Sequence, residues 1–122
     1  MKTVAIIGAS NDRNKYGNKS VRAFVRQNFQ VYPVNPTETE VEGLPAYKSI
    51  LDVPVQPNMV SLYVPPSVVL KILADIAKKG CEELWMNPGT ESDAALAEAE
   101  RLGLNVMQAC SIVAVGESPG AF

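Results

Sequence analysis

Short apolar runs alternate along the chain with longer segments in which apolar residues recur every three or four positions. The run Val4-Ala5-Ile6-Ile7 is continuous, which is typical of a parallel strand buried on both faces. Similar reasoning predicts strands at residues 4–7, 30–34, 59–64, 82–86 and 104–107. The segments with helical spacing predict helices at residues 18–27, 66–79 and 92–102.

Residues at the ends of the predicted helices support these boundaries. Asn18 is a residue type that caps helix N-termini, and it stands at the start of the first predicted helix. Gly80 and Gly103 follow the second and third helices, where a left-handed C-terminal cap belongs. The segment 36–52 has no clear period, and residues 43–47 fit a short extended piece.

Strands that alternate with helices predict an α/β fold, in which a parallel sheet carries helices on both faces. Right-handed crossover connections then give a three-layer, doubly wound, Rossmann-like domain of about five strands. The simplest strand order for such a domain is 3-2-1-4-5. With 122 residues and 13.1 kDa, the chain is predicted to form a single domain over residues 1–122.

The composition excludes several kinds of ligand, catalytic site and metal site. The net charge is −2 and the sequence pI is about 5.1, so no basic field is available to bind nucleic acid or an anionic membrane. The chain has no histidine, which excludes Ser-His-Asp and Cys-His catalysis and any imidazole metal site. Its two cysteines cannot complete a four-cysteine zinc site, so no metal is predicted.

The cysteines and the N-terminal residues predict a cytoplasmic protein. Two cysteines without a signal peptide are typical of reduced thiols in the cytosol. Met1-Lys2-Thr3 is followed at once by the first apolar run, which leaves no room for a targeting sequence. The apolar stretches are far shorter than the ~20 residues that span a bilayer, so no membrane association is expected.

The predicted strands end in loops rich in glycine and proline. In a parallel sheet these carboxyl ends share one edge, and ligands bind where the strand order reverses. Backbone with few side chains suits the close approach of an extended ligand, although strand ends need turn residues in any case. The five ends are Gly8-Ala9-Ser10, Val34-Asn35-Pro36, Tyr63-Val64-Pro65-Pro66, Asn87-Pro88-Gly89 and Ala109-Cys110.

The first of these loops indicates a ligand that carries phosphate. It leads into a predicted helix whose free N–H groups and dipole form an anion site. Ser10, Asn11, Arg13 and Lys15 add hydrogen-bond donors and positive charge. The loop lacks both the G-x-G-x-x-G motif and the Lys-Ser/Thr pair of a P-loop. Asn35 also stands where an NAD site has an acidic residue, so the pattern disfavours NAD without excluding it.

Taken in order, the motifs resemble the small stand-alone CoA-binding domain proteins. These are similar to the N-terminal Rossmann domain of the succinyl-CoA synthetase alpha subunit. The resemblance runs from Val4 to about Cys110. It rests on Gly8-Ala9-Ser10, Val31-Tyr32-Pro33-Val34-Asn35-Pro36, Gly43-Leu44-Pro45-Ala46-Tyr47, Tyr63-Val64-Pro65-Pro66 and Asn87-Pro88-Gly89.

The resemblance implies that the chain binds CoA or an acyl-CoA through its ADP and phosphate portion. Residues 10–13 would contact the phosphates and 34–37 the adenosine. Residues 63–65 would form an apolar wall, and 86–88 would line the path toward pantetheine. The predicted CoA site comprises Gly8, Ala9, Ser10, Asn11, Asp12, Arg13, Lys15, Tyr16, Val34, Asn35, Pro36, Thr37, Tyr63, Val64, Pro65, Met86, Asn87, Pro88 and Gly89.

Two departures from the family pattern limit what the resemblance implies. The synthetase has a lysine where this chain has Glu38, which puts that phosphate contact in doubt. The synthetase also uses a phosphorylated histidine from a later domain, whereas this chain has no histidine. Ligase chemistry therefore does not carry over, and no catalytic residue is predicted.

Several interpretations stay open. Cys110 is either a thiol beside the CoA sulfur or, as most free cysteines are, a small buried residue. Tyr16 either stacks on adenine or anchors its loop. The leading function is a CoA-binding module without catalysis of its own. The alternatives are an NAD(P)-binding or redox-sensing domain and an acyl-CoA enzyme completed by a partner. A homodimer or an unknown protein partner also stays open.

Overall fold

The computed structural model describes residues 1–122 and contains one main sheet of five parallel strands. Across the sheet the strands run in the order β2-β1-β5-β6-β7. Their bounds are β1 (Thr3–Ile7), β2 (Gln30–Val34), β5 (Met59–Leu62), β6 (Glu83–Met86) and β7 (Val106–Met107). The predicted α/β fold with a parallel sheet is confirmed.

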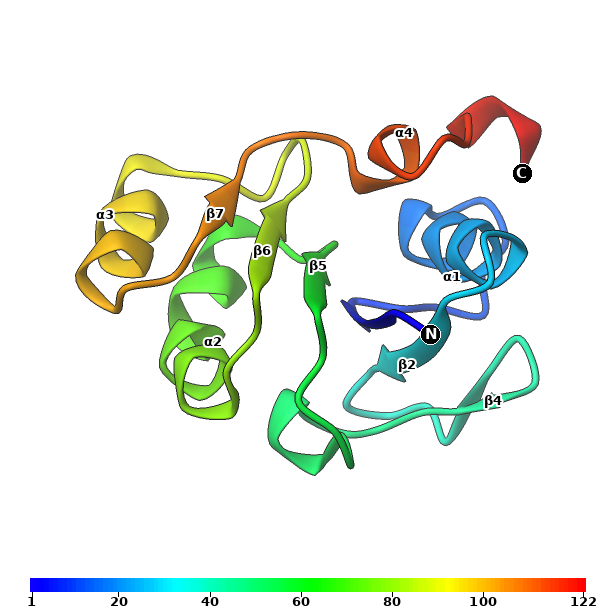
Figure 1. Ribbon diagram of the computed structural model, residues 1–122, viewed down its shortest axis with the longest axis horizontal. Helices are drawn as coiled ribbons and strands as arrows, with labels where there is room; N and C mark the ends of the chain where they lie inside the picture. The colour runs from blue at the N-terminus through cyan, green and yellow to red at the C-terminus, as the bar shows by residue number, and fades with distance from the viewer.

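Helices cover both faces of this sheet (Figure 1). The helix α1 (Tyr16–Arg26) lies on one face, where the short α4 (Ser111–Ala114) packs against it. The helices α2 (Pro66–Lys79) and α3 (Asp93–Arg101) lie on the other. The remaining elements are β3 (Glu40–Val41), β4 (Leu44–Pro45), η1 (Ile50–Asp52) and η2 (Pro119–Ala121).

The predicted strand order 3-2-1-4-5 is wrong. Numbered along the chain, the five main strands stand in the order 2-1-3-4-5, because β5 pairs directly with β1 and β2 lies at the edge. Pro33 in β2 supplies the physical reason. Its carbonyl faces outward and accepts a 2.9 Å hydrogen bond from the N–H of Tyr47. Its ring nitrogen cannot donate, and such a residue is tolerated on an edge strand but not on a central one.

The first helix begins two residues earlier than predicted. Lys15 is its N-cap residue, and no side chain caps the helix there. Asn18 lies inside the helix and is fully buried, so it does not cap the helix as predicted. The predicted segment 36–52 holds the small antiparallel hairpin of β3 and β4.

Alternate residues of the central strands feed two apolar cores. Val4 and Ile6 of β1 face α1, whereas Ala5 and Ile7 face α2 and α3. Phe24 of α1 is fully buried in the first core. Burial of large apolar side chains on both faces is the main stabilising contribution in a sheet of this kind.

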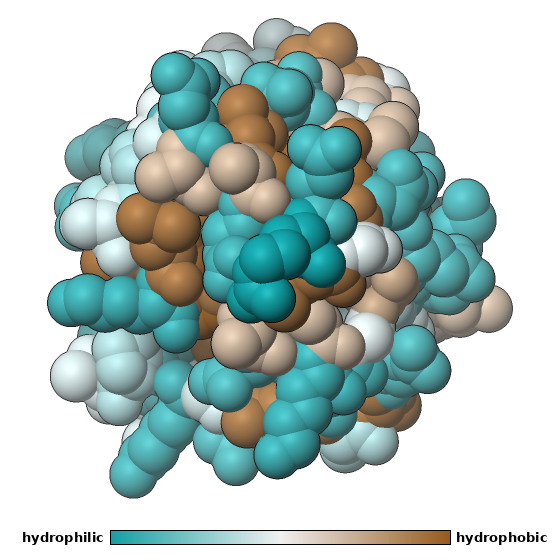
Figure 2. Space-filling view, turned by 90° about the vertical axis from the view of Figure 1, so that its left-hand side faces the viewer, coloured by the Kyte–Doolittle hydropathy of each residue, from teal (hydrophilic) through white to brown (hydrophobic).

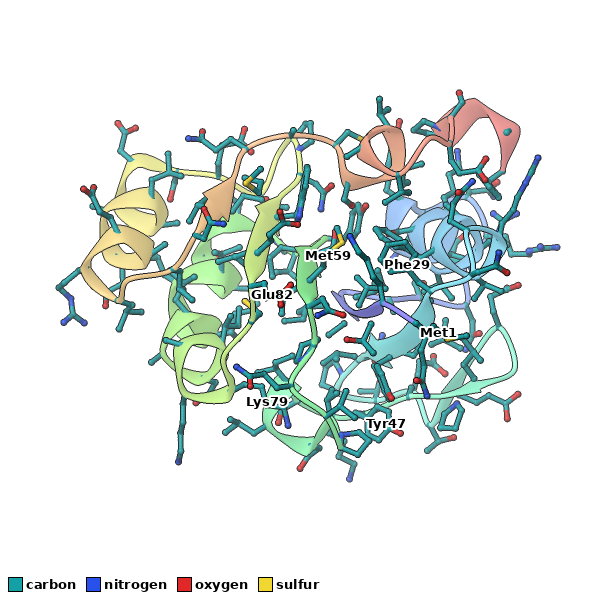
Figure 3. The ribbon with its side chains drawn as sticks, in the orientation of Figure 1. Met1, Phe29, Tyr47, Met59, Lys79 and Glu82 are labelled. Carbon is teal, nitrogen blue, oxygen red and sulfur yellow. The ribbon has the colours of Figure 1, made fainter.

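All five strands begin at one edge of the sheet and have their carboxyl ends at the opposite edge. Of the residues labelled in Figure 3, Met59 begins β5, and Phe29 and Glu82 directly precede β2 and β6. Asn58 joins this edge to β1, since its side-chain oxygen accepts a 2.9 Å hydrogen bond from the N–H of Thr3. Lys79, at the end of α2, donates to the carbonyl of Val53.

The outer surface beside α3 has scattered apolar patches separated by hydrophilic side chains (Figure 2). None of the helices has both the length and the apolar character needed to cross a membrane.

Candidate functional site

The main cavity lies at the carboxyl ends of the strands, where the strand order reverses between β1 and β5. It has a volume of about 720 Å³. Ligands of doubly wound sheets bind in this crevice, since the chain leaves the two strands in opposite directions there. The lining residues are Gly8, Lys15, Tyr16, Gly17, Tyr63, Val64, Pro65, Pro66, Asn87, Pro88, Gly89, Thr90, Cys110 and Pro119.

Two glycines allow backbone to approach backbone at the base of this cavity. Gly8 has a φ of +91°, and a Cβ there would lie 2.4 Å from the carbonyl oxygen of Tyr63. A Cβ on Gly17 would lie 2.1 Å from the carbonyl oxygen of Gly8. The end of β1, the end of β5 and the start of α1 therefore meet at distances that only glycine permits.

The N-terminus of α1 presents unused hydrogen-bond donors to the cavity. Lys15 has extended backbone, with φ −82° and ψ 146°, and no side chain caps the helix. The backbone N–H groups of Tyr16 and Gly17 have no acceptor within the chain. Residues 15–17 all line the cavity. Free N–H groups, the positive end of the helix dipole and the Lys15 ammonium are together groups that can hold an anion.

A buried polar cluster lies beneath the other side of the cavity. Asn87 is buried, with 2% of the residue exposed. Its amide group donates to the hydroxyl of Ser61 and to the carbonyl of Leu62, both at 2.8 Å. Its oxygen accepts a 2.9 Å bond from the N–H of Ser111. Asn87 thus ties β5, β6 and the start of α4 together.

Hydroxyl groups extend this cluster toward the cavity. The oxygens of Ser61 and Ser111 lie 2.8 Å apart, and those of Tyr63 and Ser111 lie 3.0 Å apart. Burial raises the pKa of Tyr63, and this effect outweighs the opposing hydrogen bonds, the largest of which is from Ser111. Tyr63 is therefore a neutral, hydrogen-bonded wall residue near neutral pH.

The two cysteines occupy different environments. Cys110 lines the cavity directly before α4, and it is half-buried. Cys81 lies near the start of β6, where burial, with a smaller effect of the Glu83 carboxylate, raises its pKa to about 11. Only Cys110 is placed to meet a ligand in the cavity.

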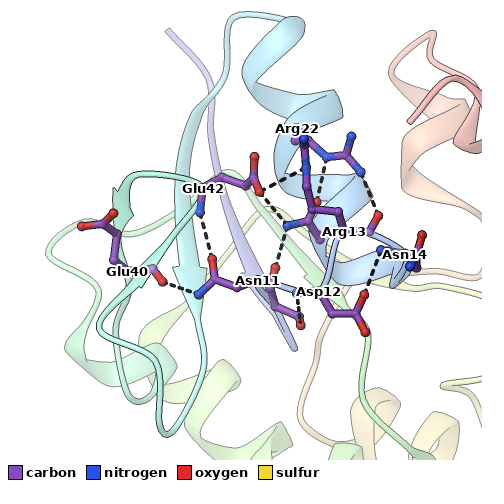
Figure 4. Close-up of polar contacts among 9 residues, drawn as sticks. Asn11, Asp12, Arg13, Asn14, Arg22, Glu40 and Glu42 are labelled. Atoms are coloured by element: carbon purple, nitrogen blue, oxygen red, sulfur yellow. Dashed lines mark hydrogen bonds and ion pairs between the residues drawn. The ribbon is translucent and has the colours of Figure 1, made fainter.

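Asn11 and Arg13 of the first loop contact the β3–β4 hairpin and the residues next to it (Figure 4). The Asn11 amide donates to the carboxylate of Glu38 at 3.1 Å and to the carbonyl of Glu40 at 2.8 Å. The Arg13 guanidinium lies 3.5 Å from the carboxylate of Glu42. Residues 10–13 therefore do not line the cavity, although the sequence suggested them as phosphate contacts.

Asn18 holds this loop in place from inside α1. Its amide donates to the carbonyl of Ser10 at 2.8 Å and to the carboxylate of Glu42 at 3.0 Å. Its oxygen accepts a 2.7 Å bond from Arg22, which also donates to the carbonyl of Arg13 at 2.9 Å. The loop is thus clamped on its hairpin side, while its cavity side stays open.

The residue that follows β2, Asn35, holds the same loop by a hydrogen bond. The Asn35 amide donates to the carbonyl of Ala9 at 2.8 Å, and its oxygen accepts from the N–H groups of Thr37 and Glu38. Residues 34–37 border the first loop without lining the cavity. Met86 is fully buried, and with Pro88 it lines a smaller cavity of about 140 Å³.

Nine residues of the predicted CoA site line the main cavity: Gly8, Lys15, Tyr16, Tyr63, Val64, Pro65, Asn87, Pro88 and Gly89. Cys110, singled out separately as a thiol, lines it too. Sequence reasoning missed Gly17, Pro66, Thr90 and Pro119, which line it as well. Pro66 is the last residue of the Tyr63-Val64-Pro65-Pro66 motif, and Thr90 directly follows Asn87-Pro88-Gly89. Including the whole first motif and one residue beyond the second would have found both. Pro119 belongs to a C-terminal segment without any periodic pattern.

Comparison with known proteins assigns this arrangement to a class. Residues 2–116 match the family model described as CoA binding domain. The chain belongs to this CoA-binding domain family. The match extends over both sides of the cavity and over all five strands of the sheet.

Named relatives are much longer than this chain. An ADP-forming acetate–CoA ligase of Methanocaldococcus jannaschii is 40% identical over 79 residues, which are 65% of this chain and 11% of the ligase. The alpha subunit of ADP-forming acetate–CoA ligase II of Pyrococcus furiosus is 39% identical over 80 residues, 63% of this chain and 17% of the subunit. The chain thus spans less than a fifth of these relatives.

A solved structure of similar size shares the fold. A conserved hypothetical protein from Pyrococcus furiosus superposes with a TM-score of 0.86 at 32% identity, covering 93% of this chain and 99% of that one.

Proposed function

We propose that the chain binds CoA or an acyl-CoA in the cavity between β1 and β5, through the ADP and phosphate portion, without catalysis of its own. The observation that carries the proposal is the open N-terminus of α1. Its free N–H groups at Tyr16 and Gly17 and the Lys15 ammonium lie in a cavity at the switch point of a CoA-binding domain.

The diphosphate is the part of the ligand that these groups suit. An anion at this helix N-terminus would satisfy donors that nothing in the chain satisfies, and Lys15 would add a charge-assisted contact. The glycine at position 17 lets the start of α1, with these donors, pack directly against the carbonyl of Gly8.

The pantetheine arm would run along the rest of the cavity. Val64, Pro65 and Pro88 offer apolar contact, and Asn87 and Thr90 stand beside them. At the end of this path Cys110 would face the CoA sulfur. A disulfide of CoA, CoA–S–S–R, would act as the oxidant. The Cys110 thiolate would attack its CoA sulfur, forming a mixed Cys110–CoA disulfide and releasing R–S⁻, which takes up a proton.

Calorimetric titration with CoA tests the proposal. The variant Lys15→Gln removes the ammonium but keeps the backbone donors, so we expect about tenfold weaker binding, or ~1.4 kcal/mol. Lys71→Gln serves as the matched control, because Lys71 is exposed on α2 outside the cavity. Absence of CoA binding by the unmodified chain, or equal loss in both variants, would contradict the proposed site.

A further inference from the structure

The C-terminal segment, residues 110–122, forms part of the wall of the main cavity at two places. Cys110 and Pro119 both line the cavity. Between them the chain forms α4 and then continues beside α1, so that η2 also contacts α1 (Figure 1). The position of the cavity wall at Pro119 therefore depends on how this segment is attached to the rest of the domain.

The two halves of the segment are attached differently. Ser111 and Ile112 are fully buried, and the N–H of Ser111 donates to the side chain of Asn87 at 2.9 Å. None of the residues 113–122 is buried, and residues 116–122 contribute nothing to either apolar core. A stretch held by surface contacts alone detaches at a lower free-energy cost than the core elements do.

Two side chains attach this second half to α1. The Glu117 side chain is only 8% exposed, and its carboxylate accepts a 2.6 Å hydrogen bond from Gln27 and lies 3.4 Å from the guanidinium of Arg26. The guanidinium groups of Arg22 and Arg26 lie 5.5 and 5.6 Å from the centroid of the Phe122 ring, within the range of cation–π interactions. We call these contacts of Glu117 and Phe122 with α1 the latch.

The latch is separate from the ligand-binding residues. Glu117 and Phe122 do not line the cavity, whereas Pro119, which stands between them, does. The family match ends at Gly116, so it does not account for the latch. Gly116 has a φ of +91°, and no atom lies within 4 Å of the position that a Cβ would take there. Residues 117–122 can therefore move about this point without a clash at Gly116.

We propose that the latch determines how long a ligand stays in the cavity. While it is closed, Pro119 is held against the bound ligand, and the ligand leaves when the latch opens and residues 117–122 move away. Glu117 is thus a positioning residue, which acts through Pro119. This inference rests on the proposed function, since it concerns the same cavity and takes CoA as the ligand.

Surface plasmon resonance tests the latch, with the full chain immobilised and CoA as the analyte. Glu117→Ala and Phe122→Ala should each raise the dissociation rate of CoA about fivefold and change the association rate less than about twofold, because the latch adds contacts after entry. Glu117→Gln, whose side-chain oxygen can still accept from Gln27, should raise the dissociation rate less than Glu117→Ala does. A loss of folded protein alone would lower the amount of CoA bound without changing its dissociation rate.

Glu98→Ala is the matched control. Glu98 is paired with Arg101 on α3, away from the cavity, so its loss should leave both rates of CoA binding unchanged.

A second measurement needs no variant. The N–H of Ala121 donates to the carbonyl of Ser118 at 2.9 Å within the latched stretch. Its amide hydrogen exchange, followed by NMR, should slow when CoA is bound, because a ligand against Pro119 keeps the latch closed.

Two results would each overturn the inference and leave the proposed function intact. One is a CoA dissociation rate that is the same in Glu117→Ala as in Glu98→Ala, and the other is Ala121 exchange that saturating CoA does not change. If CoA does not bind to the unmodified chain, the proposed function itself fails.

Discussion

The edge of the sheet at which the strands begin and the edge at which they end differ in how their polar groups are hydrogen-bonded. At the edge where the strands begin, Asn58 and Thr3 satisfy each other with bonds of 2.9 to 3.1 Å. At the opposite edge Asn87 is similarly satisfied, but the N–H groups of Tyr16 and Gly17 beside it have no partner. The polar groups at the first edge are paired within the chain, whereas the second edge has two N–H donors without a partner.

The closeness of backbone packing at the glycines Gly8, Gly17 and Gly103 also differs between these two edges. Gly8 and Gly17 bring three elements into direct contact at the carboxyl edge, whereas Gly103, before β7 at the other edge, has open space around the position of a Cβ. Tight backbone contact therefore occurs where the cavity lies. Variants at matched positions of the two edges separate a role in folding from a role in binding.

Gly17→Ala should have the largest effect. Its Cβ would lie 2.1 Å from the carbonyl oxygen of Gly8, so either α1 or the first loop must move. We expect a loss of about 3 kcal/mol in the free energy of unfolding, measured by urea denaturation. The control Gly103→Ala meets no atom within 4 Å and suffers only from its φ of +75°, so about 1 kcal/mol is expected. Equal losses in the two variants would contradict the contact at Gly17.

Asn87→Ala should have the second-largest effect on the free energy of unfolding. It leaves the carbonyl of Leu62 and the N–H of Ser111 without a partner in a buried place, so a loss of about 2–3 kcal/mol is expected. Because Asn87 also joins Cys110 and α4 to the cavity, CoA binding should weaken as well. Asn58→Ala removes bonds at the other edge and should lower stability by about 1–2 kcal/mol without changing CoA affinity. An Asn87→Ala chain that binds CoA normally would show that the cluster serves stability alone.

The smallest expected effect is the difference in reactivity between the thiols of Cys81 and Cys110. The pKa of Cys81 is raised to about 11, so its thiolate, the form that reacts, becomes abundant only as the pH rises toward that value. At pH 8 iodoacetamide should therefore modify Cys110 first, as followed by mass spectrometry of Cys81→Ser and Cys110→Ser chains. CoA should slow the modification of Cys110 and leave that of Cys81 unchanged. Faster reaction of Cys81 at pH 8, or equal protection of both thiols, would contradict this assignment.

The sequence was sufficient to predict the five main strands, the helices α1, α2 and α3 and the edge of the sheet at which the cavity lies, because hydrophobic period and turn residues are local signals. The short elements β3, α4, η1 and η2 carry no such signal. The strand order was mispredicted, although Pro33 indicated an edge strand. The direction of the first loop depends on tertiary contacts. Arg13 faces Glu42 because the hairpin folds beside the loop, and residues 36–52 carry no pattern from which that contact follows. Pro119 reaches the cavity for similar reasons.

CoA binding in the cavity between β1 and β5 is tested most directly by a map of amide chemical-shift changes when CoA is added to the isotopically labelled chain. We expect shifts for the amides of Gly8, Tyr16, Gly17, Thr90 and Cys110, with the free N–H groups of Tyr16 and Gly17 among the largest. The amides of Thr3, Asn58 and Glu82, at the other edge, should stay unchanged. Shifts confined to that other edge, or Tyr16 and Gly17 amides unaffected by saturating CoA, would contradict it.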